Sequence, residues 1–556
     1  MTLVMAIEQT MDRPVVLLIN PHVPDAMGEP LMENLAIGSL AAYLEHHGIS
    51  VDLADCAIDK LPIGTLPSHV KLGDYQVAGI TIMARSCVKA AMAVAQSIRL
   101  KNPEIHLVSG GKFPTSNPDT LLFAGSPFDS VIRHDGERPL LELVQRVLKG
   151  GDWSSVPNLS KAQGNGSRHN PLDFQYIQSD LDRLPLVDRR FLPLFLDRNA
   201  PTTVSASRGC IYSCEFCVVS AESKSLWGKP RWRGRSAESI ANELEYLIRK
   251  FKIAEIWFVD DLFLGPMPRG KKRIHELCNE IHRRNLKLGF SFEERSDSVI
   301  NNKELFRELK RAGLRRVFLG LESGDMKTLT RYKKGSTPEQ HLEAIDFLQQ
   351  IGVEVSTGFI LFDPFKSMET LKEEICFLRK LVHRRIFFPP VFNSALQLIK
   401  EAPIFDQVVA AGLLMTDGEH LEYDYNDQRV KCIAKALKWL FMARNGTLFF
   451  TLKWIIGNEW RKSGAFPGSP VSRTHSHLIC ELAAFYKTFV LDTSEKIMEV
   501  ICEWPSDDPQ LTDTFDLKPL LPDVDNFSRE IIFLTNVIRL AYSLEQHNEY
   551  SPVAAN

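Results

Sequence analysis

The sequence lacks an excess of charge of either sign, and it lacks any long apolar run. It carries 66 Lys and Arg against 69 Asp and Glu, which leaves a formal net charge of −3. Proteins that hold a phosphate backbone need a basic excess, so we expect no nucleic-acid partner. The N-terminal segment has no basic stretch followed by an apolar one, and apolar runs elsewhere are too short or too charged to span a bilayer. We therefore expect no transmembrane segment and a cytoplasmic location.

Outside one cluster, the chain also lacks paired cysteine spacings, internal repeats and low-complexity tracts. Scattered thiols are typical of a reducing compartment rather than of a disulfide framework. The scattered cysteines are Cys56, Cys87, Cys278, Cys376, Cys432, Cys480 and Cys502. The 556 residues exceed what one hydrophobic core covers, and a prior of ~150 residues per domain suggests three or four domains, fewer if one is an α/β barrel.

Residues 1–150 alternate between short apolar runs and segments with helical periodicity. The apolar runs are residues 15–20, 51–55, 77–83, 105–111 and 129–137, and the helical segments are 33–48, 87–101, 118–125 and 138–150. This alternation predicts an α/β fold, a Rossmann-like or flavodoxin-like doubly wound parallel sheet with helices on both faces. Such sheets bind ligands at the carboxyl ends of their strands. The loops that begin at Asn20, Met83, Gly110 and His134 are therefore expected to form a site.

Three further regions follow. Residues 151–200 break this alternation with a GNGS stretch and scattered prolines, and they are predicted to be a linker without a domain of its own. Residues 201–400 contain six predicted strands, at 202–209, 255–261, 287–294, 316–323, 353–362 and 391–399, with helices near 236–252, 268–285, 301–313, 337–352 and 367–384. Six β/α units in this length favour a partial, open (βα)6 barrel with its chemistry at the carboxyl ends of the strands. Residues 401–556 are predicted to be a helical C-terminal domain.

The stretch RGCIYSCEFC places Cys210, Cys214 and Cys217 directly after the first predicted barrel strand. Structural zinc wants four ligands, usually as two separated pairs, and no second Cys or His pair follows. Three buried inert thiols would not require a short polar loop at a strand end. An iron–sulfur cluster fits best, because three thiolates on one tight loop hold three corners of a cubane and leave the fourth iron open to a ligand.

The Cys-x3-Cys-x2-Cys spacing, with the aromatic Phe216 before the last cysteine, resembles the radical S-adenosylmethionine (SAM) superfamily over about residues 202–400. That resemblance implies a 4Fe–4S cluster that binds and cleaves SAM. The residues that it implies for SAM binding are Phe216, Asp260, Arg295, Glu322, Ser323 and Gly358. Asp261 is a second candidate beside Asp260. Two alternatives stay open: strand-end aspartates that cap the next turn, and a surface ion pair for Arg295.

A doubly wound domain ahead of such a barrel resembles the cobalamin-binding branch of the superfamily. The loops that carry the likeness are "NP", "SGGKFPT" and "RHDGERP". The implied cobalamin-binding residues are Asn20, Pro21, Ser109, Gly110, Gly111, Gly136 and Glu137. The chain departs from many cobalamin proteins because the Asp-x-His-x-x-Gly motif, which supplies a cobalt-ligating histidine, is absent. Arg85 is expected near the lower face of the corrin, where its positive charge would disfavour a cobalt ligand, and His22 is an alternative candidate for a cobalt ligand.

This resemblance implies a cobalamin-dependent radical SAM methyltransferase that uses a 4Fe–4S cluster, SAM and methylcobalamin to methylate an unactivated carbon of a small-molecule substrate, such as a natural product or a lipid-like compound. An electron donor such as flavodoxin or ferredoxin is the expected partner. The alternatives are a cyclase, oxidoreductase or rearrangement enzyme, a polar methyltransferase that makes no radical, and a corrinoid or iron–sulfur sensor. The aromatic run near residues 439–460 leaves a peripheral membrane contact open beside a core seam.

Overall fold

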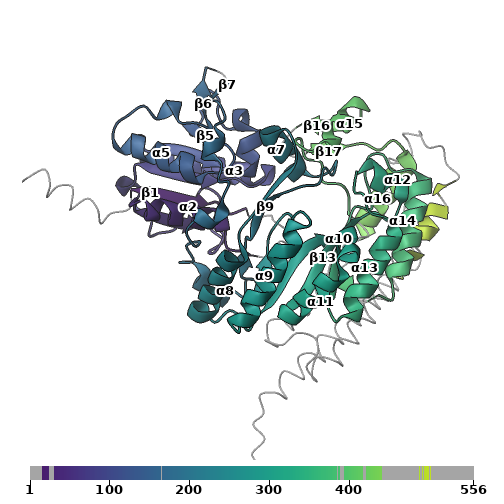
Figure 1. Cartoon of the computed structure of the whole chain (residues 1–556). Helices are drawn as coiled ribbons and strands as arrows, with labels where there is room; N and C mark the ends of the chain where they lie inside the picture. The colour runs from purple at the N-terminus through teal and green to yellow at the C-terminus, as the bar shows by residue number, and fades with distance from the viewer. Residues whose placement is uncertain are drawn as a thin grey trace, which may run out of the picture. The chain divides into compact units, whose positions relative to one another are not determined.

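The computed structural model describes residues 15–23, 31–164, 166–384, 386–387, 394–417, 421–440, 488, 491–492, 494–499 and 501–502. The chain divides into two compact units. Unit 1 comprises Met1–Tyr212, Val219–Phe292 and Asp417–His420, and unit 2 comprises Ser213–Val218, Glu293–Thr416 and Leu421–Asn556. Figure 1 shows both and labels many of their helices and strands.

The N-terminal part of unit 1 is a seven-stranded sheet in the order β2-β1-β3-β4-β5-β6-β7. Its five parallel strands are β1 (Val16–Asn20), β2 (Val51–Asp55), β3 (Val77–Thr81), β4 (His106–Gly110) and β5 (Ser130–Ile132). The order 2-1-3-4-5 is that of flavodoxin-like folds, and it reverses between β1 and β3. The predicted doubly wound parallel sheet is therefore confirmed.

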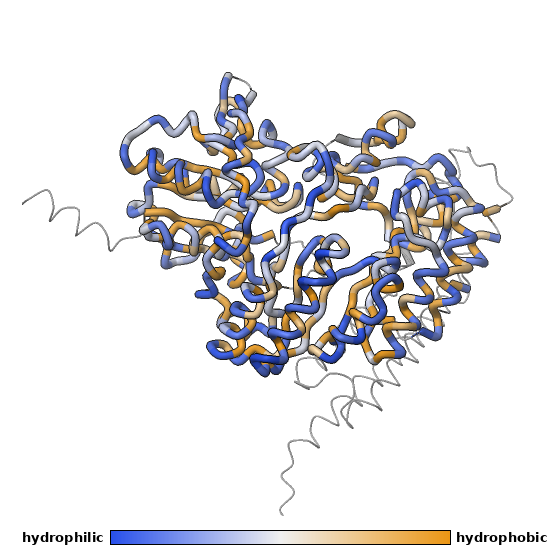
Figure 2. Tube along the Cα trace, viewed as in Figure 1, coloured by the Kyte–Doolittle hydropathy of each residue, from blue (hydrophilic) through white to orange (hydrophobic). Residues whose placement is uncertain are grey.

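Helices cover both faces of this sheet because its buried side chains alternate along each strand. Val16 and Leu18 of β1 pack with α2 (Leu35–His46) and α5 (Glu137–Leu148) on one face. Leu17 and Ile19 pack with α3 (Val88–Lys101) on the other face. Period-two burial on both faces requires a strand that is apolar throughout, and Figure 2 shows β1 in the colour of hydrophobic residues.

Two segments of this region differ from the sequence-based prediction. The linker 151–200 contributes β6 (Leu159–Gln163) and β7 (Gly166–His169), which extend the sheet as antiparallel strands beyond β5. They pair the backbone groups that β5 would otherwise leave open at an edge. The helix predicted at 118–125 is only a single 3-10 turn, Pro118–Thr120, which follows the short helix α4 (Lys112–Ser116).

The barrel region forms a six-stranded sheet in the order β15-β14-β13-β12-β11-β8, with the pairs β8–β11, β11–β12, β13–β14 and β14–β15 parallel. This confirms the open six-stranded architecture. The strands are β8 (Thr203–Val204), β11 (Glu255–Phe258), β12 (Gly289–Arg295), β13 (Leu314–Glu322), β14 (Glu354–Phe359) and β15 (Ile386–Phe387). The longest helices between them are α8 (Ala237–Phe251), α9 (Arg269–Arg283), α11 (Lys303–Ala312), α13 (Pro338–Gln350) and α14 (Met368–Leu381).

Two of the predicted barrel strands lie elsewhere than expected. The first, 202–209, breaks into β8 and β9 (Ser207–Cys210), and β9 pairs antiparallel with β10 (Arg231–Gly234). The break occurs where the Asp260 carboxylate accepts hydrogen bonds from the Ala206 amide and the Ser207 hydroxyl, which turns the chain between the two strands. The sixth strand is β15 rather than 391–399, of which residues 388–393 lie outside the described part and Ala395 forms only an isolated bridge to Phe362.

Most of the predicted helical domain 401–556, including the aromatic run near 439–460, lies outside the described residues. The described part contains α15 (Ile404–Ala410), α16 (Gln428–Leu440) and the two short strands β16 (Leu414–Asp417) and β17 (Leu421–Tyr423). Within the part of the chain that the structure describes, no helix combines the length and apolar character needed to cross a bilayer.

Candidate active site

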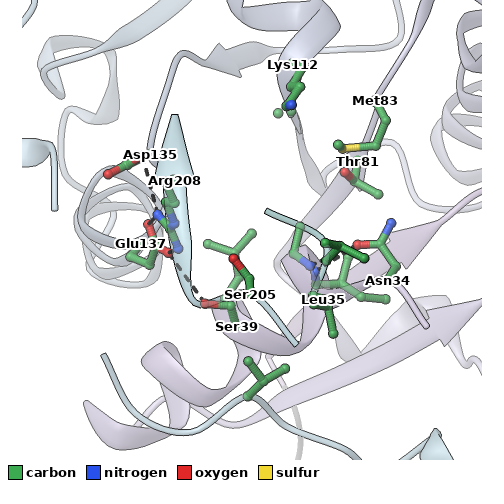
Figure 3. A pocket seen from close by; sticks show the side chains of 18 of the residues that line it. Asn34, Leu35, Ser39, Thr81, Met83, Lys112, Asp135, Glu137, Ser205 and Arg208 are labelled. Atoms are coloured by element: carbon green, nitrogen blue, oxygen red, sulfur yellow. Dashed lines mark hydrogen bonds and ion pairs between the residues drawn. The ribbon is translucent and has the colours of Figure 1, made fainter. Parts of the chain in front are cut away.

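A cavity of about 1020 Å³ opens in unit 1 at the carboxyl ends of the parallel strands. Asn20 ends β1, Thr81 ends β3 and Gly110 ends β4, and all three line it, as does His134 just after β5. Figure 3 labels Thr81 among the residues around the cavity. This is the crevice where the strand order reverses, and open α/β sheets bind ligands there. Its volume is at the upper end of the range typical of small-molecule sites, as a large, flat ligand would require.

Seven of the eight residues predicted to bind cobalamin line this cavity: Asn20, Pro21, Ser109, Gly110, Gly111, Gly136 and Glu137. Arg85 is not among the lining residues, and its guanidinium lies 5.5 Å from the centre of the Phe113 ring. His22 does line the cavity, and burial lowers its pKa.

The floor of the cavity depends on Gly111. Its φ of +118° lies in a region that side chains rarely adopt, and a Cβ there would be 2.4 Å from the Ile82 carbonyl oxygen. The turn after β4 therefore packs backbone against backbone, and position 111 requires a glycine. The neighbouring Asn20 amide donates to Asp55 at 2.9 Å, which ties the end of β1 to the end of β2.

The two aspartates after β11 do different things. Asp260 is 3% exposed and accepts from the Ala206 amide at 3.2 Å, and burial raises its pKa to about 6. Asp261 lines the cavity, pairs with Lys112 at 3.3 Å and accepts from the Gly209 amide at 3.3 Å. Asp260 thus acts within the fold on the strand that leads to the cysteines, whereas Asp261 faces the cavity.

The cysteine loop begins at Cys210, the last residue of β9, and ends at Cys217, where α7 (Val218–Trp227) begins. Gly209 precedes it with φ of +82°, and a Cβ there would be 2.4 Å from the Arg231 carbonyl oxygen. A glycine is therefore needed for the chain to turn into the loop.

In unit 2, Arg295 lies beside the central cysteine. Its Nη1 is 3.8 Å from Cys214 Sγ, its Nε donates to Asp297 at 3.0 Å, and its Nη2 donates to the Lys334 carbonyl. Arg295 is only 7% exposed, so its ion pair is buried rather than on the surface. The Arg295 guanidinium thus lies against a sulfur of the predicted cluster loop.

Glu322 and Lys334 form an ion pair near the aromatic residue of the cysteine motif. Lys334 Nζ lies 3.0 Å from Glu322 Oε1 and 5.9 Å from the centre of the Phe216 ring. Glu322 ends β13 at φ of +65°, next to a register shift against β14. A Cβ on the predicted residue Gly358 would be 3.8 Å from Glu322 Oε2, so Phe216, Glu322 and Gly358 share one neighbourhood.

Lys334 was missed by the sequence analysis. It stands in a polar "KKGS" segment, which resembles a solvated turn, yet its side chain is 6% exposed. Ser323 occupies a different environment from Glu322. Its hydroxyl donates to the buried Glu374, which also pairs with Lys366, so its local role is in a buried polar cluster.

Among the described residues, no three His, Cys, Asp or Glu side chains converge on a point that could hold a single metal ion. A cubane does not require such convergence, because each thiolate binds a different iron atom.

The fold and these sites define a two-part class of protein, a doubly wound ligand-binding domain followed by a partial barrel with a three-cysteine loop. Residues 204–378 match the radical SAM superfamily model, and residues 26–144 match the B12 binding domain model. The chain therefore belongs to the cobalamin-binding radical SAM enzyme superfamily.

Curated relatives and a solved structure are similar over long stretches. The uncharacterized methyltransferase PH0819 of Pyrococcus horikoshii is 28% identical over 62% of this chain and 73% of its own length. The 4'-phospho-dehydrooxetanocin synthase of Priestia megaterium is 27% identical over 66% of this chain, but the match spans only 51% of that protein. A solved structure of the cobalamin-dependent SAM radical enzyme OxsB, with aqua-cobalamin and SAM bound, superposes on this chain with a TM-score of 0.70, which shows a shared fold. The superposition covers 96% of this chain and 84% of the OxsB chain, and the two sequences are 19% identical.

The radical SAM domain implies a 4Fe–4S cluster and SAM, and the B12 binding domain implies cobalamin, as predicted. Radical SAM enzymes act on small molecules and need a reductant. The residues present fit these groups: the cavity is large and the Gly110–Gly111 turn lines it, and Arg295 at the end of β12 places a guanidinium next to Cys214.

Proposed function

We propose that this protein is a cobalamin-dependent radical SAM methyltransferase that methylates an unactivated carbon of a small-molecule substrate, either a natural product or a lipid-like compound. The observation that carries the proposal is the wall of the cavity in unit 1. The Gly110–Gly111 turn of the B12 binding domain and Gly209, the residue before Cys210, both line it. The proposed corrinoid site and Cys210, the first residue of the cysteine loop, thus belong to the same compact unit.

The chain supplies binding and orientation in this proposal. Cys210, Cys214 and Cys217 are the cluster ligands, and Arg295 Nη1 lies 3.8 Å from Cys214 Sγ. Lys334 and Glu322 offer one cation and one anion, which match the carboxylate and the amine of a methionyl group. When bound, the cluster supplies the electron that cleaves SAM, and the corrinoid supplies a carrier for the methyl group.

Two aspartates after β11, Asp260 and Asp261, fix the backbone near the cavity. The Asp261 carboxylate accepts from the Gly209 amide and pairs with Lys112, so it keeps the turn after β4 close to the start of the cysteine loop. Asp260 accepts a hydrogen bond from the Ser207 hydroxyl and so fixes the start of β9, the strand that carries Gly209. We infer that these aspartates fix the geometry and that neither acts as a general base.

The test uses the products of SAM, because they distinguish the two ways in which SAM is consumed. Methyl donation leaves S-adenosylhomocysteine, whereas reductive cleavage gives methionine and, after hydrogen abstraction, 5'-deoxyadenosine. The anaerobically reconstituted protein is incubated with SAM and dithionite or with reduced flavodoxin, and both products are counted. Formation of both supports the proposal, and the absence of S-adenosylhomocysteine in every condition contradicts it.

The matched variant is Cys210→Ala. It removes one thiolate ligand, so 5'-deoxyadenosine formation should fall to background while bound cobalt stays near one per chain. A Cys278→Ala variant is the control, since Cys278 is a buried thiol of α9 with no predicted role. Undiminished SAM cleavage by Cys210→Ala would refute the assignment of the cysteine motif.

A radical reaction without methyl transfer is the second candidate. The relative from Priestia megaterium is named a synthase rather than a methyltransferase, and it is 27% identical to this chain. That candidate predicts 5'-deoxyadenosine without S-adenosylhomocysteine under the same conditions, so one product assay separates the two functions.

A further inference from the structure

The antiparallel ribbon of β9 and β10 ends at Cys210 and carries Arg208 and Arg233 as a facing pair. Arg208 pairs in register with Arg233, and Cys210 pairs with Arg231. Arg208 is two residues from Cys210, so the backbone that positions the first cysteine is the backbone that carries this guanidinium. Both arginines line the cavity of unit 1.

These two arginines meet two carboxylates of the B12 binding domain. Arg208 Nη2 lies 2.6 Å from Glu137 Oε1, and its Nη1 lies 3.3 Å from Asp135 Oδ1. Arg233 binds the same Asp135 carboxylate and donates to the Gln178 carbonyl at 2.6 Å. Figure 3 shows Arg208 between Asp135 and Glu137.

The carboxylates are well buried, so removing their arginine partners would leave buried charges unpaired. The side chains of Glu137 and Asp135 are 5% and 11% exposed. Burial by itself raises the pKa of Asp135, but the charges of Arg208 and Arg233 outweigh it and hold that pKa at about 2. The Asp135 carboxylate is therefore ionised at neutral pH and depends on both arginines.

A second tie joins the same two regions. Asp261 Oδ2 accepts from the Gly209 amide at 3.3 Å, and Asp261 Oδ1 lies 3.3 Å from Lys112 Nζ. Lys112 follows the Gly110–Gly111 turn that floors the cavity. The two residues before Cys210 are thus each held by a group that lines the cavity, Arg208 by Glu137 and Gly209 by Asp261.

We propose that Arg208 is a positioning residue that couples the corrinoid cavity to the cysteine loop, so that filling the cavity and assembling the iron–sulfur cluster favour each other. The proposal rests on the proposed function, because it assumes that a corrinoid fills the cavity and that Cys210 binds the cluster. A ligand packed against Glu137 and Asp261 restricts the side chains that hold Arg208 and Gly209, and a cluster bound at Cys210 restricts the same strand at its end. Coupling of this kind is reciprocal.

The experiment measures the affinity of hydroxocobalamin for the protein with and without its cluster. Cluster-free protein is made by anaerobic chelation, and binding is followed by the absorption change of the corrinoid. In the wild type, the cluster should tighten binding by about fivefold or more, the lower end of typical coupling between two sites. In the reverse direction, hydroxocobalamin should slow the release of iron to a ferrous chelator by a similar factor.

Arg208→Ala should reduce both ratios to near one, while the circular dichroism spectrum stays that of the wild type. Arg208→Lys keeps the charge but loses the two-pronged contact, so its ratios should be intermediate. Glu137→Gln breaks the same contact from the other side and gives a second reading if Arg208→Ala does not fold.

Arg99→Ala is the matched control, because the Arg99 side chain is 28% exposed and pairs with Asp129 at 2.6 Å, but it does not line the cavity. It should keep the wild-type ratios. Wild-type ratios near one, or unchanged ratios in Arg208→Ala and Glu137→Gln, would overturn the coupling while leaving the proposed function standing. A wild-type protein that binds no cobalamin or no iron would overturn the proposed function and the coupling with it.

Discussion

The buried ion pair between Lys334 and Glu322 allows a quantitative prediction about unit 2. The two charges lie 3.0 Å apart, with side chains 6% and 14% exposed. At an effective dielectric constant of about 20, such charges attract each other by about 5 kcal/mol. Desolvation offsets part of this attraction, so the intact pair adds little to stability, but removing one partner leaves a buried, unpaired charge at a cost of about 3–5 kcal/mol.

Lys334→Met and Glu322→Gln should therefore each lower the free energy of unfolding by about 3 kcal/mol or more. The double variant replaces both charges, so it should be more stable than the sum of the two single changes predicts, with a coupling free energy of at least about 2 kcal/mol. Urea unfolding of the cluster-free protein, followed by circular dichroism, measures all four species. SAM affinity of the reconstituted variants is measured in parallel, and it should fall in both single variants.

The control is the pair Lys327 and Glu369, which lies at a similar distance of 2.9 Å but is 67% and 74% exposed. The corresponding double-variant cycle there should show no measurable coupling. If the Lys334 and Glu322 changes were strictly additive, burial of this pair would not control its energetics and the reasoning would fail.

Two further predictions concern the cavity and pH. Gly111→Ala should weaken hydroxocobalamin binding at least tenfold, because the new Cβ would be 2.4 Å from the Ile82 carbonyl oxygen. Gly125→Ala is the control and should bind hydroxocobalamin normally, because Gly125 also has a positive φ, +84°, but no atom lies within 4 Å of its Cβ position. Equal affinities of the two variants would refute the importance of the close approach at Gly111. Burial lowers the pKa of His341 to about 3. The imidazole therefore stays neutral in the folded protein down to about pH 3, whereas in the unfolded chain it takes up a proton below its unfolded pKa of about 6.5. The free energy of unfolding is therefore greatest above that unfolded pKa and falls as the pH falls toward 3. Replacing His341 by Gln should remove up to about 1.4 kcal/mol per pH unit from the slope of unfolding free energy across this window. An unchanged slope would contradict the assignment.

The local patterns of the sequence were sufficient for the alternation of strands and helices. The apolar runs at β1 to β5 are short and bounded by turn residues, and that signal is local. The hairpin of β6 and β7 could not be predicted from local patterns, because β6 pairs with the edge of β5. Which strand forms an edge depends on the assembled sheet. The break between β8 and β9 was missed for the same reason, since Asp260 that holds it is more than fifty residues away in the chain.

For the candidate site, the spacing of Cys210, Cys214 and Cys217 can be read directly from the sequence, because the three proposed cluster ligands lie in one short stretch of the chain. The glycine turns after β4 are equally local. By contrast, the meeting of Arg208 with Glu137 and the burial of Lys334 against Glu322 depend on strand order and on how elements pack. A polar residue in a loop looks the same in the sequence whether it faces water or a buried carboxylate. The sequence alone therefore determined the class of chemistry, whereas only the tertiary structure decided which charges hold the cysteine loop in place, because those charges come from segments distant in the chain.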